Sequence, residues 1–270
     1  MCTNRFALPS IPYLFTASIR IVRERKILAG ELKRIYRELS DAVGRLDFGP
    51  PVTHVYNPLG YASAPAEDYL EKYGSSQKEV LFLGMNPGPW GMAQTGVPFG
   101  TVSKVRDWLA IGGPVGKPPD EHPRRPVLGF EVAREEISGD RFWVWAQDRF
   151  GTPGAFFDRF FVANYCPLVF MEASGRNRTP DKLPAHERNP LFRYCDEALR
   201  KVVQCLEPEM VVGIGKFAEG RAVSALAGTG MRTGSILHPS PASPLANRGW
   251  QQQAERQLRH LGVSLAGGID

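Results

Sequence analysis

A short apolar run at residues 80–83 leads into a loop of unusual composition that extends to residue 100. The run reads Val-Leu-Phe-Leu, which is typical of a buried strand. The loop, GMNPGPWGMAQTGVPFG, contains five glycines and three prolines. Because proline fixes φ and glycine adopts conformations closed to other residues, such a loop has a defined shape. Seventeen residues is long for an ordinary strand-to-helix connection, which is the alternative, so we expect a binding loop at a strand end.

Three further apolar runs of strand type follow, at residues 156–162, 209–214 and 235–237. Helical patterns alternate with these runs, and this alternation indicates a parallel sheet with helical crossovers. The sequence therefore predicts an α/β fold, a three-layer sandwich with a central, mostly parallel four-stranded sheet flanked by helices.

The N-terminal part of the chain predicts a helical extension. Residues 1–15 have the pattern of a loosely ordered leader, and residues 49–65 that of a linker-like loop rich in glycine and proline. We expect residues 1–48 to form a leader and a helix packed on the core, and residues 49–270 to form the main domain, the two making one structural unit. We expect helices at residues 17–46, 67–73, 99–111, 191–206 and 251–261, and one more that ends at residue 227.

Composition limits the class of protein. No apolar stretch approaches the length of a membrane span, and the N-terminus lacks a signal pattern, so we expect a soluble, cytoplasmic protein without membrane contact. The net charge is +5, and arginine makes up 24 of the 33 basic residues. Because the planar guanidinium suits phosphate, the charge favours a polyanionic partner, although GC-rich codon usage gives the same bias.

The four cysteines, Cys2, Cys166, Cys195 and Cys205, form no CxxC pair. Four thiolates can hold an iron–sulfur cluster, but these lie outside the usual ligand spacing. We therefore expect no disulfide, no metal and no cofactor.

Three polar residues, Asn86, Asn164 and His238, each follow a predicted strand. The carboxyl ends of parallel strands lie at one edge of a sheet, so we expect these side chains to converge on one crevice. The alternative for Asn164 is a capping residue at a strand end, and for the histidine a satisfied structural residue.

Three motifs resemble one known family. GMNPGPWGMAQTGVPFG, then NYCPL with MEASGRN close behind, then HPSPASPLANRGW are similar to the single-strand-selective monofunctional uracil-DNA glycosylases of the uracil-DNA glycosylase superfamily. The resemblance extends from Tyr56 to the final helix. It implies a uracil-DNA glycosylase-like catalytic domain over residues 49–270, with single- and double-stranded DNA containing damaged bases as the partner, and we expect a monomer.

The resemblance also implies the reaction. The family excises uracil and certain 5-substituted uracils by hydrolysis of the N-glycosidic bond, and leaves an abasic site for base excision repair. We expect uracil and 5-hydroxymethyluracil as substrates, with xanthine and hypoxanthine as further candidates because they share the hydrogen-bonding edge of uracil. The base must be taken from single strands or flipped out of a duplex.

The matched positions carry the family's roles. His238 faces the O2 atom of the leaving base and Asn86 positions the attacking water, so these two are the expected catalytic residues. Phe99 stacks under the base, and the amide of Asn164 reads its N3–H and O4. Because the amide of asparagine does not retain a proton, Asn86 can orient the water but hardly activate it, which fits a largely dissociative reaction. Backbone groups around Met85 and Gly88 complete the expected base-binding set, and no motif contains a lysine for lyase chemistry.

The third motif implies a wedge that enters the DNA stack. The family usually has arginine where this chain has Ala242, and asparagine where it has Ser243. Ala242 is too small to fill the space of an extruded base, so duplex activity is expected to be weaker, or Leu245 compensates. The expected DNA-binding and wedge residues are Pro239, Ser240, Pro241, Ala242, Ser243, Leu245 and Arg248, with Arg176 and Arg178 as phosphate contacts.

Two other readings stay open. One is a catalytically weak DNA-binding protein of the same fold, and the other is an α/β enzyme acting on free nucleotides. The presence of both Asn86 and His238 favours catalysis, and the wedge and the arginine excess favour a polymer. In a bacterium, the resemblance places the protein at the nucleoid.

Overall fold

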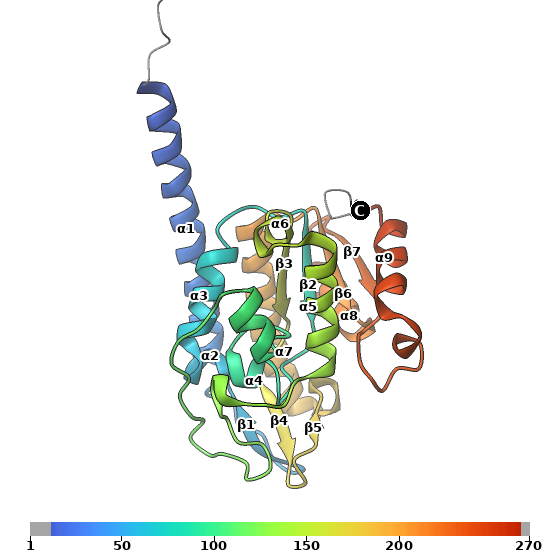
Figure 1. Ribbon diagram of the computed structural model, residues 1–270. Helices are drawn as coiled ribbons and strands as arrows, with labels where there is room; N and C mark the ends of the chain where they lie inside the picture. Colours follow the sequence, from blue (N-terminus) through green and yellow to red (C-terminus); the bar gives the residue numbers. More distant parts are fainter. Residues whose placement is uncertain (1–11, 266–270) are drawn as a thin grey trace, which may run out of the picture.

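The computed structural model describes residues 12–265, with side chains from residue 23 onward. Figure 1 shows a central sheet between layers of helices, with the long helix α1 (Pro12–Val43) along one side and its N-terminal part extending past the body. The helix continues through Gly30 without a break. Residues 1–11 of the expected leader lie outside the described residues.

The central sheet has four parallel strands in the order β3 (Phe160–Asn164), β2 (Val80–Gly84), β6 (Met210–Ile214) and β7 (Arg232–Ile236). This confirms the predicted four-stranded parallel sheet. All four carboxyl ends lie at the same edge because the strands are parallel. β3 and β2 are paired along their whole length, up to Gly84 and Asn164.

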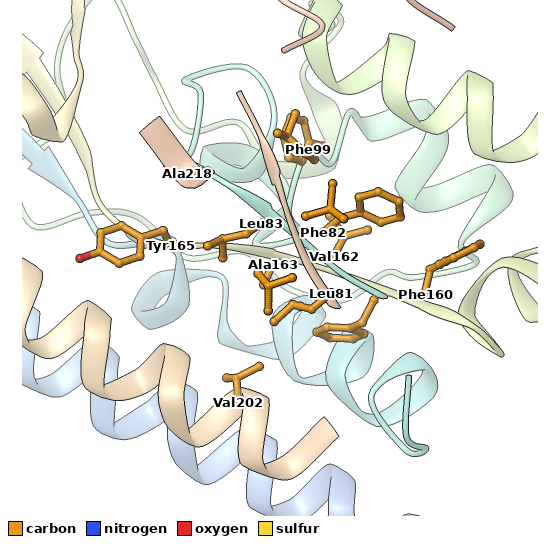
Figure 2. Packing of buried hydrophobic residues seen from close by; sticks show 14 of the residues in the cluster. Leu81, Phe82, Leu83, Phe99, Phe160, Val162, Ala163, Tyr165, Val202 and Ala218 are labelled. Carbon is orange, nitrogen blue, oxygen red and sulfur yellow. The ribbon is translucent and has the colours of Figure 1, made fainter. Parts of the chain in front are cut away.

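Helices cover both faces of this sheet. Alternate side chains of a strand point to opposite faces, and the Phe82 ring contacts Phe142 and Trp145 of α5 at centroid distances of 5.8 and 6.0 Å. Figure 2 shows Phe82 in the sheet, with Val202 of α7 on the opposite side. Truncating a buried ring such as Phe82 to alanine typically costs about 3–5 kcal/mol. The covering helices are α5 (Ile137–Phe150), α6 (Pro153–Phe157) and α9 (Trp250–His260) on one face, and α7 (Ala185–Leu206) and α8 (Lys216–Ala225) on the other.

Helix α1 packs on α7 and α3 (Ser63–Tyr73) through an apolar stripe. Its buried residues recur every three or four positions, as the helical pattern predicts. They are Leu32, Ile35, Leu39 and Val43.

A second sheet corrects the prediction that residues 49–65 form a linker-like loop. Strand β1 (Val52–Tyr56) pairs antiparallel with β4 (Val169–Glu172), which pairs with the short β5 (Asn177–Arg178). The flanking prolines and glycines are typical of a loop, so the local sequence did not indicate this strand. Its hydrogen-bond partners lie more than a hundred residues further along the chain.

Other boundaries also differ from the predictions. The apolar run at residues 156–162 contains the end of α6 and the start of β3, since aromatic residues suit both a buried helix and a strand. The helix predicted at residues 99–111 is a π-helical turn, Lys104–Trp108. Helix α5 was not predicted. The remaining short helices are α2 (Pro58–Tyr61), α4 (Met92–Thr95), and the 3₁₀ turns Gly129–Glu131, Pro180–Lys182 and Ala246–Arg248. Within the described part of the chain, no helix is long and apolar enough to cross a membrane.

Candidate active site

Three predicted site residues lie at the carboxyl edge of the parallel sheet. Asn164 is the last residue of β3, and Asn86 and His238 come two residues after β2 and β7. Backbone pairing continues past the strands, because the N–H of Cys166 donates to the carbonyl of Met85 at 2.9 Å. The segment that carries Met85 and Asn86 is thereby tied to the segment that follows Asn164.

Phe99 and Asn164 both contact Gly84. A Cβ atom built on Gly84 would lie 2.2 Å from Asn164 Oδ1 and 2.7 Å from Phe99 Cε2, so only glycine leaves room for both. Phe99 has a φ of 55°, a left-handed conformation that is rare for an aromatic residue and is often found at functional sites. Its ring stacks on Phe142 and lies 6.3 Å from the His238 ring, centroid to centroid.

The amide of Asn164 has its nitrogen 3.2 Å from the sulfur of Met92, on α4. The side chain is almost fully buried at the end of β3. Its position is therefore set by the sheet on one side and by α4 on the other.

The amide of Asn86 is oriented by two backbone carbonyls, of which that of Pro87 lies 3.4 Å from the side-chain nitrogen. The same nitrogen donates to the carbonyl of Leu168 at 3.1 Å. Because the nitrogen is engaged, the Oδ1 atom of this half-buried side chain is left to accept a hydrogen bond from a ligand or a water molecule.

His238 is neutral at physiological pH. Burial lowers the pKa of its imidazole to about 4 because the charged form is poorly solvated there. The preceding residue, Leu237, is held by α9, since its N–H donates to Gln257 at 2.7 Å and its carbonyl accepts from the Trp250 indole at 2.6 Å. A neutral imidazole in this place offers one N–H donor to a ligand.

Residues 239–248, here called the wedge loop, follow His238. Arg141 of α5 donates to the carbonyl of Pro239 at 3.2 Å and to the side-chain oxygen of Asn247 at 2.9 Å. Within the loop, Ser240 Oγ accepts from the N–H of Ala242 at 3.2 Å. Further such bonds join Pro241 to Asn247 and Ser243 to Ala246. The Leu245 side chain is 55% exposed, an uncommon position for a large apolar residue.

The predicted basic contacts fall into two groups. Arg178 is engaged within the protein, because it pairs with Glu172 at 2.9 Å and donates to the carbonyl of Lys182. Lys216 is exposed and pairs with Glu219. Arg176 and Arg248 are exposed, and no acceptor for either guanidinium is present among the described residues.

Sequence reasoning missed a cationic cluster around Trp90, in the loop after β2. The guanidinium carbons of Arg125 and Arg134 lie 5.3 and 4.9 Å from the centroid of the indole ring. Arg134 has no ion pair within the described residues. Guanidinium groups commonly pack on aromatic rings, but this preference alone does not indicate which arginines lie near Trp90 until the fold is known.

Sequence reasoning also missed Glu136, the residue before α5. Its carboxyl lies against Gly88, where a Cβ atom would come within 1.9 Å of Oε2. Burial raises the pKa of this carboxyl to about 7. No local pattern indicates this contact, which joins residues far apart in the sequence.

Three of the four cysteines belong to the residues that the structure describes. Cys166 and Cys195 are buried and Cys205 is half-buried, while Cys2 lies outside the described residues. Among residues 12–265, no group of three or more histidine, cysteine or acidic side chains is placed to hold a metal ion.

Comparisons with known proteins identify the family of this chain. The sequence profile of the Uracil DNA glycosylase superfamily matches residues 71–259. A single-strand selective monofunctional uracil DNA glycosylase from Mus musculus is 50% identical over 241 residues, which cover 88% of this chain and 86% of that protein. Its counterpart from Bos taurus is 48% identical over 260 residues, which cover 94% of this chain and 95% of that protein.

A solved structure shares the fold. The crystal structure of wild-type Pedobacter heparinus SMUG2 superposes with a TM-score of 0.60 at 18% identity, over 84% of this chain and 97% of that chain. Since the superfamily profile spans most of the sequence and relatives with about half of their residues identical match nearly all of it, the chain belongs to the single-strand selective monofunctional uracil-DNA glycosylase family, within the uracil DNA glycosylase superfamily.

Proposed function

We propose that this protein is a monofunctional DNA glycosylase, a hydrolase that excises uracil from DNA and leaves an abasic site for base excision repair. The names of its relatives support this reaction. The observation that carries the proposal is the arrangement of Asn86, Asn164 and His238 around Phe99, at one edge of the sheet. No cofactor enters the proposed reaction.

Base recognition is assigned to Phe99 and Asn164. The base stacks on the Phe99 ring, an interaction typically worth about 1–3 kcal/mol. The Asn164 amide accepts from N3–H of uracil and donates to O4. Cytosine presents the opposite pattern at these two atoms, so it would leave buried polar groups unpaired, at about 1–3 kcal/mol each.

Bond cleavage is assigned to His238 and Asn86. As the glycosidic bond breaks, negative charge collects at O2 of the base, and the N–H of the neutral His238 imidazole donates to this oxygen. A preorganised donor of this kind typically contributes about 2.7–4 kcal/mol. Asn86 Oδ1, with its Nδ2 engaged by Leu168, accepts from the water that captures the sugar cation. Backbone groups at Met85 and Gly88 complete the pocket.

DNA contact is assigned to the wedge loop and the arginines near it. Leu245 is the apolar side chain that fills the space of the extruded base, in place of the small Ala242. Arg248 and Arg176 contact phosphates. We include single- and double-stranded DNA as substrates, and 5-hydroxymethyluracil, xanthine and hypoxanthine as further bases. The packing of α1 on α7 supports the proposal that the described parts of residues 1–48 and 49–270 form one structural unit. We further propose that the protein acts as a monomer in the compartment that holds the DNA.

The test uses single-stranded and duplex oligonucleotides that contain one of these four bases. We expect uracil release from both forms, with strand breakage only after alkali. Absence of an abasic product from every substrate leaves the DNA-binding alternative, and breakage without alkali contradicts the monofunctional reaction. Activity on free deoxyuridine nucleotides but not on DNA favours the nucleotide-directed alternative.

A further inference from the structure

Glu136 is the residue before α5, but its side chain does not cap that helix. It reaches the loop after β2 instead, where its carboxyl lies against Gly88 and Gly91. Built Cβ atoms on Gly88 and Gly91 would come within 1.9 and 2.7 Å of Glu136 Oε2. The carboxyl therefore occupies the space that a side chain at position 88 would fill.

One oxygen of this carboxyl has no hydrogen-bond partner. Oε2 of Glu136 is buried, and no group of the described residues bonds to it. Burial also raises the pKa of the carboxyl to about 7, which keeps much of it in the neutral acid form. A buried polar atom without a partner is unfavourable, so this oxygen is a place where a ligand group gains a hydrogen bond.

In the base orientation of the proposed function, the 5-position of the base lies beside the Glu136 carboxyl. The inference therefore rests on the proposed function. There the Asn164 nitrogen donates to O4, and in the structure that nitrogen touches Met92, at the start of α4. In this orientation the O4 side of the base lies toward Met92, four residues after Gly88, and C5 is the ring atom next to C4. O2 lies on the opposite side of the ring, toward His238.

We propose that Glu136 is a specificity-determining residue for the substituent at C5 of the excised base. Its carboxyl forms a hydrogen bond with a hydroxymethyl group at this position. Gly88 and Gly91 serve the same purpose, because any side chain there would displace the carboxyl.

The test measures kcat/KM for uracil and for 5-hydroxymethyluracil in otherwise identical single-stranded oligonucleotides. Glu136→Met keeps the length of the side chain and removes its polar tip, and Glu136→Asp withdraws the carboxyl by one methylene. We expect the 5-hydroxymethyluracil-to-uracil ratio to fall at least about tenfold in both variants, which corresponds to about 1.4 kcal/mol. Glu136→Gln retains a donor and an acceptor, so its ratio should stay within about threefold of wild type. The control is Glu135→Gln, at the adjacent exposed carboxylate, and it should leave the ratio unchanged.

The ratio separates specificity from general damage to the loop. If Glu136→Asp, or any folded Glu136→Met, lowers both rates equally, Glu136 only shapes the loop and the inference is overturned. The same holds if the wild-type protein releases uracil but not 5-hydroxymethyluracil. Failure to release either base would instead refute the proposed function.

Discussion

The guanidinium of Arg141 donates to the side-chain oxygen of Asn247 at 2.9 Å, which ties the wedge loop to helix α5. The same guanidinium donates to the carbonyl of Pro239, at the start of the loop. Asn247 in turn donates to the carbonyl of Pro241 at 2.9 Å. Because α5 packs against the core, these bonds hold an exposed loop in a fixed place relative to the base pocket.

Replacing Arg141 with alanine should impair duplex repair more than single-strand repair. Extrusion from a duplex needs the wedge, whereas a single strand offers the base freely. Hydrogen bonds from a charged group contribute about 1.5–3 kcal/mol, so kcat/KM on duplex substrate should fall at least about tenfold. On single strands we expect a loss of less than about threefold. Arg256→Ala, at an exposed position of α9, is the control; equal losses on the two substrates would show that Arg141 does not act through the wedge.

Alanine at His238 or at Asn86 should each lower turnover by at least about tenfold, because each change removes a contact made in the transition state. DNA affinity should change little. Single-turnover kinetics on uracil-containing single strands, with binding measured separately, check both statements. A variant that turns over at nearly the wild-type rate would remove that residue from its proposed role.

Two buried groups give opposite pH dependences of stability. Glu136 has its pKa raised to about 7, so the folded state keeps a proton that the unfolded chain releases, and stability falls as pH rises from about 4.5 to about 7. His238 has its pKa lowered to about 4, so stability rises with pH from about 4 to about 6.5. Between about pH 4.5 and pH 6.5, the contributions of Glu136 and His238 to stability therefore change with pH in opposite directions.

Glu136→Gln should therefore change the pH profile of stability. Above about pH 7 the variant should be more stable than the wild-type protein, because no charge is buried. Below about pH 6.5 it should show the slope from His238 alone, at most about 1.4 kcal/mol per pH unit. Urea denaturation at intervals between pH 4.5 and pH 8 measures both. Parallel curves for the two proteins would contradict the buried, neutral state of Glu136.

Arg134→Ala should reduce the salt dependence of DNA binding. The Arg134 guanidinium lies over the Trp90 ring and has no acidic partner among the described residues, so it is available to a phosphate. Removal of one phosphate contact lowers the slope of log affinity against log salt by about one. Arg106→Ala is the matched control, because Arg106 is already paired with Asp107 at 2.7 Å. If both variants keep the wild-type slope, Arg134 does not meet DNA.

Gly84→Ala should abolish most of the activity while the protein stays folded. The added methyl group would overlap Asn164 Oδ1 and the edge of the Phe99 ring. Overpacking of this kind typically costs about 1–3 kcal/mol of stability, but displacement of both base contacts should lower kcat/KM by at least about a hundredfold. Thermal unfolding and uracil release from single strands distinguish the two effects, and near-normal release would place the base elsewhere.

The sequence was sufficient to predict the central sheet and the positions of Asn86, Asn164 and His238 at or just past the carboxyl ends of its strands. Each lies at or beside a short apolar strand, and parallel strands bring such positions to one edge. Strand β1 was not predicted, because its identity as a strand depends on pairing with β4, far along the chain. Local pattern carries no information on such long-range pairing.

Glu136 was not predicted for a related reason. A glutamate that follows another glutamate is typical of a solvated surface. Its burial follows from the absence of a side chain at Gly88, which lies 48 residues earlier, together with the fold that brings the two together. The family resemblance indicated Gly88 as a base-binding position, but only the three-dimensional packing shows which side chain fills the space beside it.

Gly84 and Asn164 are the last paired residues of β2 and β3. Asn164, the residue proposed to distinguish uracil from cytosine, is thus part of the hydrogen-bonded ladder of the sheet. Its backbone is therefore not free to move independently of the two strands. A slip of one residue would bring Ala163 or Tyr165 to that place. We therefore expect fidelity and folding to be lost together: heat or mutation that weakens the sheet should yield an inactive protein before it yields one that attacks normal bases.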